Sequence, residues 1–149
     1  MTEPAGAVGI GTLYLVDNSV WARMPRSATV AARIADVHRQ HAICVTTAQV
    51  LEYGFSAPSP SDLDAAHQAM SAFPLLAMSR RTHEIALDVQ QRLWHSGRLR
   101  AAGAFDTLIA AVAIEHDATV LHYDRDYEHI AAAVPEFRQE LVAPLGTLP

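Results

Sequence analysis

The sequence contains no lysine, because all 11 of its Lys and Arg residues are arginines. The chain therefore cannot form a Schiff base with a substrate, and it lacks the lysine of a P-loop or of a catalytic amine site. Arginine still permits bidentate contacts with phosphate oxygens. The absence of lysine excludes several classes of enzyme and leaves phosphate recognition open.

Cysteine is almost as scarce, since Cys44 is the only one. A single cysteine excludes an intrachain disulfide and a thiolate metal cluster, and its apolar surroundings, AICV, predict that it is buried. No apolar run approaches the length of about 18 residues that a membrane-spanning helix needs. Glu3 stands where a signal peptide carries positive charge. We therefore expect a cytoplasmic protein without membrane contact.

Positive charge is also in short supply. The formal net charge is −5 and the isoelectric point is near 5.8, which argues against nucleic-acid binding by bulk electrostatics but leaves room for a local basic rim. The length of 149 residues suits one domain, and a hydrophobic content of 50% indicates a folded chain. We predict a single domain over residues 1–149, with residues 1–11 as a flexible lead-in.

Short apolar runs alternate with helical patterns along the chain. Because such alternation is typical of parallel sheets, it predicts an α/β fold of three layers with helices on both faces of the sheet. The sheet would contain four or five strands. The predicted strands are residues 12–17, 41–45, 75–78 and 118–122, with a fifth within 140–144; the predicted helices are residues 28–40, 47–55, 61–73, 82–94, 105–114 and a segment after 123.

Carboxylates occur where this fold would bring them together. Asp17 and Asp124 each follow a predicted strand, Asp106 lies in the first turn of an apolar helix, and Glu52 lies within the helix after the second strand. In an open parallel sheet, ligands bind beyond the carboxyl ends of the strands. The sequence therefore predicts that these four acids meet at one edge of the sheet.

Each acid also has a purely structural explanation. Asp17, Asp106 and Asp126 could cap helices, and Glu52 could form a surface ion pair. These explanations do not account for the set, because clustered carboxylates repel one another and are costly to desolvate. A cluster of oxygen ligands without cysteine or histidine spacing favours a hard cation, Mg²⁺ or Mn²⁺. Such an ion can activate water for the cleavage of a phosphodiester.

Four blocks of sequence carry a resemblance to a known family. They are LVDNSVW around Asp17, QVLEYGF around Glu52, AFDTLIAAVAI around Asp106 and VLHYDRDYEHI around Asp124. In this order and spacing, over residues 13–130, the chain resembles the PIN-domain ribonucleases, and among them the VapC toxins of VapBC toxin–antitoxin pairs. The resemblance implies a PIN fold, endoribonuclease activity that depends on Mg²⁺ or Mn²⁺, inhibition by a small VapB-like antitoxin, and a homodimer.

By the same resemblance, Asp17, Glu52, Asp106 and Asp124 form the catalytic and metal-binding set. Ser19 would support the site, and Asp126 is a candidate fifth carboxylate. The family often has Thr or Ser two residues before the last acid of the set, where this chain has His122. We expect His122 to bond to backbone at the strand end, and the alternative is that it orients water or metal.

The aromatic residues Trp21, Trp94 and Phe105 are expected to pack in the core or in an interface rather than to stack on bases.

Two other readings compete with a ribonuclease. A phosphotransfer fold, either a haloacid-dehalogenase-like phosphatase or a receiver domain, also begins with a strand that ends in aspartate. The phosphatase needs a second acid at the position of Ser19, and both normally use a lysine, which is absent here. The other reading is a catalytically silent PIN domain that serves as a binding module. Four intact acids argue against it, and Mn²⁺ binding would discriminate the two.

Overall fold

Four parallel strands form one sheet in the order β2-β1-β3-β4. The computed structural model describes residues 11–149, so the predicted lead-in lies outside the described residues except for Gly11. The strands are β1 (Leu13–Val16), β2 (Ala42–Cys44), β3 (Thr119–His122) and β4 (Arg138–Leu141). Leu15 of β1 lies opposite Cys44 on one side and Val120 on the other. The predicted parallel sheet is confirmed, with four strands among the described residues.

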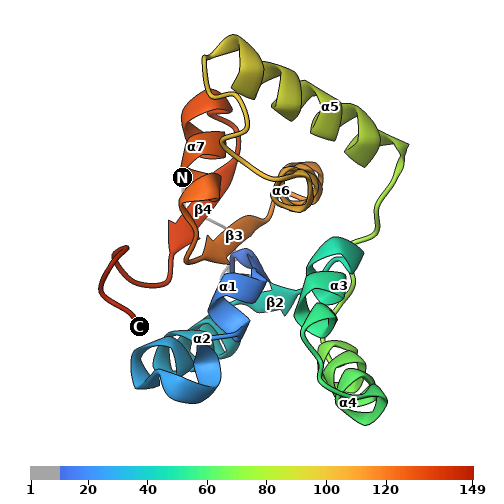
Figure 1. Cartoon of the computed structure of the whole chain (residues 1–149), viewed down its shortest axis with the longest axis vertical. Coiled ribbons are helices and arrows are strands. Elements are labelled where there is room, and N and C mark those ends of the chain that lie inside the picture. Colours follow the sequence, from blue (N-terminus) through green and yellow to red (C-terminus); the bar gives the residue numbers. More distant parts are fainter. Residues whose placement is uncertain (1–10) are drawn as a thin grey trace, which may run out of the picture.

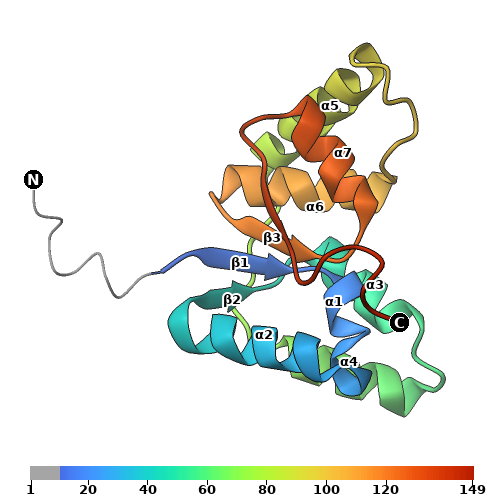
Figure 2. The ribbon, with the colours of Figure 1, turned by 90° about the vertical axis from the view of Figure 1, so that its left-hand side faces the viewer.

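Helices cover both faces of this sheet and complete the predicted three layers (Figures 1 and 2). The helices α5, α6 and α7 lie on one side, and α1, α2 and α4 lie on the other. Their bounds are α1 Asn18–Trp21, the 3-10 turn η2 Met24–Arg26, α2 Ala28–Gln40, α3 Thr47–Phe55, α4 Pro60–Met70, α5 Arg80–His95, α6 Ala104–Glu115 and α7 Arg125–Ala133. Within residues 11–149, no helix is both long enough and apolar enough to cross a membrane.

Burial on two faces explains the continuous apolar run of β1. Leu15 packs in the cluster under α5, α6 and α7, which includes Ile109 and Val120. Its neighbours Tyr14 and Val16 point to the opposite face and join the cluster beneath α2. Because successive side chains of a strand alternate between faces, a strand covered on both sides needs an apolar residue at every position.

Two of the predicted strands differ in the structure. Residues 75–78 are not a strand, because only Leu75 forms a bridge, to Val45. Leu75 and Met78 are 60% and 38% exposed, so this apolar run lies along the sheet edge and only Leu76 packs in the core. The last strand, β4, begins at Arg138, two residues before the predicted segment 140–144, and it forms the other edge of the sheet.

The prediction that Cys44 is buried is confirmed. Its side chain has no exposed surface, and its Sγ lies 3.1 Å from the carbonyl oxygen of Tyr14, to which the thiol donates. Burial raises the pKa of the Cys44 thiol to about 12. The thiol is therefore a small apolar group of the core, without thiolate reactivity at neutral pH.

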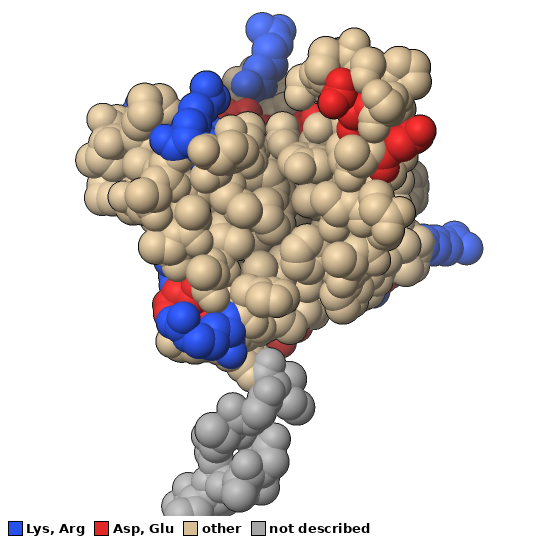
Figure 3. All heavy atoms as spheres, turned by 90° about the horizontal axis from the view of Figure 1, so that it is seen from below, with Lys and Arg blue, Asp and Glu red and all other residues tan. Residues whose placement is uncertain are grey.

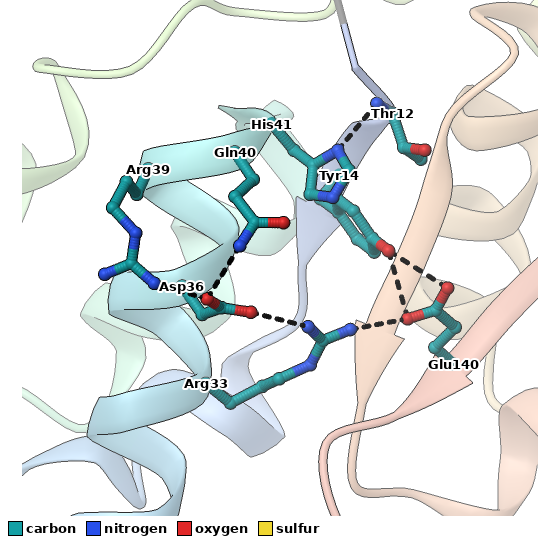
Figure 4. A network of polar contacts seen from close by, with 8 residues as sticks. All are labelled: Thr12, Tyr14, Arg33, Asp36, Arg39, Gln40, His41 and Glu140. Atoms are coloured by element: carbon teal, nitrogen blue, oxygen red, sulfur yellow. Dashed lines mark hydrogen bonds and ion pairs between the residues drawn. The ribbon is translucent and has the colours of Figure 1, made fainter.

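A polar network fastens α2 to the edge strand β4 across the sheet (Figure 4). The carboxylate of Glu140 accepts hydrogen bonds from the Tyr14 hydroxyl at 3.0 and 3.1 Å and from the Arg33 guanidinium at 2.9 Å. Asp36 extends the network along α2 by pairing with Arg33 and Arg39. Only Tyr14 is buried among these residues. The network therefore lies at the boundary between the buried core beneath β1 and the solvent.

We expect Tyr14→Phe to lower the free energy of unfolding by about 1 kcal/mol. The substitution keeps the buried ring and removes one charge-assisted hydrogen bond, whose acceptor retains Arg33. The control is Arg39→Gln, whose exposed ion pair with Asp36 is expected to contribute less than about 0.5 kcal/mol. Urea denaturation measures both variants, and equal losses would contradict a special contribution from the Tyr14 hydroxyl.

Candidate active site

Two of the predicted acids follow neighbouring strands. Asp17 comes directly after β1 and Asp124 comes two residues after β3, and each is the N-cap of the helix that follows. The backbone N–H of Asp17 donates to the carbonyl oxygen of Leu121 at 2.9 Å, which extends the pairing of β1 with β3 to the site. The two carboxylates therefore lie at the carboxyl edge of the sheet, as the sequence predicts.

Helices bring the other two acids to the same place. Glu52 lies on α3 and Asp106 lies in the first turn of α6. One oxygen from each of Asp17, Glu52 and Asp106 lies within 4.8 Å of the other two. Asp124 lines the same pocket, which has a volume of about 690 Å³. The structure therefore brings all four predicted acids together.

Asp126 belongs to the same cluster, although it does not line the pocket. One oxygen from each of Asp106, Asp124 and Asp126 lies within 4.8 Å of the other two. The backbone N–H of Asp126 also donates to the Asp124 carboxylate at 3.0 Å. Asp106 is thus shared by two overlapping groups of carboxylates.

Hydrogen bonds hold the buried carboxylate of Asp17 in one orientation. Its Oδ2 accepts from the backbone N–H and the hydroxyl of Ser19, at 3.0 and 2.6 Å, and its Oδ1 accepts from the Tyr127 hydroxyl at 2.7 Å. The hydroxyl oxygen of Ser19 accepts in turn from the backbone N–H of Tyr123 at 2.9 Å. Ser19 thus supports the site as predicted, by joining Asp17 to the end of β3.

Sequence reasoning missed Tyr127. Its side chain is completely buried, and burial followed by the negative charge of Asp17 raises the pKa of its hydroxyl well above the usual value. The hydroxyl therefore stays protonated and donates to Asp17. The sequence did offer a signal, because Tyr127 lies three residues before Ile130 and therefore on the same, buried face of α7. A buried tyrosine hydroxyl needs a hydrogen-bond partner.

Burial and neighbouring charges raise the pKa of three of the clustered carboxylates. Burial raises the pKa of Asp106 to about 8, and Asp126, Asp17 and Asp124 add to the shift. Burial, with the charges of Asp17 and Asp124, also raises the pKa of Glu52. Burial likewise raises the pKa of Asp124, partly offset by the N–H of Asp126. Within residues 11–149 no arginine or histidine forms an ion pair with any of these acids.

His122 lies behind the pocket rather than in it. It is completely buried; its Nδ1 accepts from the backbone N–H of Asp124 at 3.0 Å, and its Nε2 lies 2.5 Å from the Gln139 side-chain oxygen. Burial lowers the pKa of the imidazole, so the neutral ring donates through Nε2. His122 does bond to backbone as expected, and it positions Asp124; its second partner, Gln139 of β4, could not be foreseen.

Exposed apolar side chains border the acids. Phe55, Phe105 and Leu51 line the pocket and are 92%, 43% and 53% exposed. Trp21 is buried in the core, as predicted. Phe105 and Trp94, which is also 40% exposed, are not core residues, and their place in an interface stays a prediction. The pocket therefore combines an acidic floor with an apolar rim.

Comparison with known proteins places this chain in a family. The PIN domain profile matches residues 14–133. Ribonuclease VapC51 of Mycobacterium tuberculosis is 36% identical over 135 residues, which cover 91% of this chain and 96% of that protein. Ribonuclease VapC18 of the same organism is 33% identical over 142 residues, covering 91% of this chain and 99% of that protein.

Solved structures show the same fold. VapBC2 from Rickettsia felis, bound to a promoter DNA fragment, matches with a TM-score of 0.73 at 13% identity, over 87% of this chain and 98% of that one. VapBC-5 from Mycobacterium tuberculosis, of the VapBC family of toxin–antitoxin systems, matches with a TM-score of 0.62 at 20% identity, over 87% and 97%. The fold, the acids at its carboxyl edge and these relatives agree: the chain belongs to the PIN-domain family, in its VapC ribonuclease branch.

Proposed function

We propose that this protein is a metal-dependent endoribonuclease toxin that cuts RNA phosphodiesters. The observation that carries the proposal is the convergence of Asp17, Glu52, Asp106 and Asp124 in one pocket, without an ion pair to neutralise them among the described residues. Burying such a cluster is costly unless a cation binds to it. The curated relatives are named as ribonucleases, which supports RNA as the substrate.

The donor set fits Mg²⁺ or Mn²⁺. All its ligand atoms are carboxylate oxygens, which suit hard divalent ions. Such an ion, when bound, would activate water and neutralise charge on the leaving oxygen. Asp17 and Asp106 are our candidates for direct ligands, and Glu52 and Asp124 would complete the ligand set or orient the water. Ser19 and Tyr127 fix the direction of the Asp17 carboxylate.

Purified protein incubated with total cellular RNA tests this function. We expect discrete fragments in Mg²⁺ or Mn²⁺ and none in excess chelator, because the carboxylates alone repel phosphate. A thermal-unfolding series with Mn²⁺ reports metal binding separately. Metal binding without cleavage in any RNA pool would favour the silent binding module, and cleavage that persists in chelator would refute the metal-dependent mechanism.

Ser19→Ala is expected to reduce cleavage about tenfold without altering the fold. The variant keeps the backbone N–H contact to Asp17 but loses the short hydroxyl contact and the link to Tyr123, so the carboxylate is less well oriented, and small misplacements are costly. Ser71→Ala, at the exposed C-cap of α4, is the matched control. Equal rates for wild type and Ser19→Ala would show that the backbone contact and Tyr127 suffice.

The pocket also supports a small antitoxin as partner. Carboxylates without an ion-pair partner favour the binding of a basic side chain from another chain. Beside them an apolar groove of about 570 Å³ runs between α3 and α4, lined in part by Leu51, Phe55 and Leu63. Co-expression with the product of a small neighbouring open reading frame is expected to suppress RNA cleavage, and unchanged cleavage in a stable complex would contradict this role.

We also propose a homodimer in the cytoplasm, where the RNA is. The face formed by α2 and α4 supports a second copy, because its centre carries no charged side chains and its charges lie at the edges (Figure 3). The core of an interface is depleted of charged residues relative to the rest of the surface. Light scattering of the purified protein measures the mass directly, and a monomer at micromolar concentration would refute the dimer.

A further inference from the structure

We propose that Phe55 and Phe105 are base-stacking residues, which hold the two nucleobases on either side of the scissile phosphate. This inference rests on the proposed ribonuclease function and adds a determinant of substrate choice. Both side chains line the pocket that holds Asp17, Asp106 and Glu52.

The exposure of the two rings has no explanation in the packing of the fold. Phe55, the last residue of α3, is 92% exposed, and Phe105, in the first turn of α6, is 43% exposed. Neither belongs to the two core clusters, and within residues 11–149 neither ring stacks on another aromatic ring. Large exposed apolar groups gathered at one place indicate a binding surface.

The position of the rings favours nucleobases as their ligand. Phe105 immediately precedes Asp106, and Phe55 is three residues after Glu52, so each ring is tied by its helix to an acid of the pocket. A phosphate drawn to the metal site would carry its bases outwards to the rim, where the rings lie. Aromatic side chains bind unpaired bases by stacking, and every base offers a face.

This arrangement disfavours base-paired substrate. Bases within a duplex stack on one another, so their faces are not available to the rings. The acidic pocket also lacks arginine among its lining residues, so bulk attraction to phosphates cannot replace stacking. The rings therefore give the site a preference for single strands and tolerance of base identity.

The test measures binding as well as cleavage. The probe is a single-stranded oligoribonucleotide carrying the fluorescent base 2-aminopurine at alternate positions, titrated with the full chain in Ca²⁺. We expect fluorescence quenching with wild type, a dissociation constant at least about fivefold higher for Phe55→Leu and for Phe105→Leu, and recovery with Phe55→Trp. The same strand annealed to its complement is expected to show no quenching.

Trp94→Leu is the matched control, because Trp94 is similarly exposed on α5 but does not line the pocket. For cleavage, the leucine variants are expected to raise KM and to leave kcat within about twofold. Equal probe affinity for wild type and both leucine variants would overturn the inference. So would variants that bind the probe normally but lose the antitoxin, since the rings would then be a protein-docking surface. Quenching without cleavage would refute the proposed ribonuclease activity and would still support base stacking by the two rings.

Discussion

Asp106→Asn is expected to lower the rate of RNA cleavage at least about a thousandfold. The Asp106 carboxylate is common to both groups of clustered acids, so its loss removes a candidate metal ligand from each group. A metal ion contributes several kcal/mol of transition-state stabilisation, and each 1.36 kcal/mol corresponds to a factor of ten in rate. Asparagine keeps the size and one oxygen of the side chain and removes the charge.

Single-turnover cleavage of an RNA defined by the first fragments measures this loss. The control is Asp64→Asn, an exposed aspartate on α4 outside the pocket, which is expected to cleave at the wild-type rate. Circular dichroism of both variants separates loss of chemistry from loss of fold. A folded Asp106→Asn protein that cleaves within tenfold of wild type would remove Asp106 from the metal-binding set.

The same substitution is expected to stabilise the protein in the absence of metal, by about 2 kcal/mol at pH 8. The folded chain raises the pKa of Asp106 to about 8 from a usual value of 3.8, so the folded state binds the proton more tightly than the unfolded state. Stability from this group is therefore present below pH 4 and is lost as the pH rises towards 8. Each tenfold change in proton affinity corresponds to about 1.4 kcal/mol, and solvent at the open pocket screens part of the effect.

Asparagine does not ionise, so the variant does not lose folding stability in this way as the pH rises from 4 to 8. The difference in stability between variant and wild type is expected to be small near pH 4 and to grow up to pH 8, where it reaches roughly 4 to 8 °C in Tm. Chelator-treated protein must be used, and Asp64→Asn again serves as control. A difference that does not change with pH would show that burial and the neighbouring carboxylates do not raise the pKa of Asp106. Added Mn²⁺ is expected to reverse the order, since it binds the wild type.

The positions of the four acids could be predicted because they depend on simple rules. Strands that alternate with helices place their carboxyl ends at one edge of a sheet, and Asp17 and Asp124 follow two such strands. The position of Asp106 could be predicted once the start of its helix was recognised. These rules use residue order alone, so a single sequence sufficed for the fold class and for the acidic set.

Other features depend on packing that residue order does not encode. Residues 75–78 have the composition of a buried strand, but only Leu76 is buried, since the segment has one bridge to the sheet. The partner of the Tyr127 hydroxyl is 110 residues away in the sequence. The exposure of Phe55 depends on where α3 ends. Long-range contacts and surface exposure had to come from the structure.

The order of strands also decides when the site can form. β1 lies between β2 and β3, and Asp17, near the start of the chain, is held by Tyr127, near its end. A nascent chain whose β3 and α7 have not yet left the ribosome carries Asp17 without β3 beside it, and without Tyr127 and Asp124. Since domains generally fold as units during synthesis, the four acids cannot come together until α7 has left the ribosome. The acidic site is therefore absent from the chain until translation is almost complete.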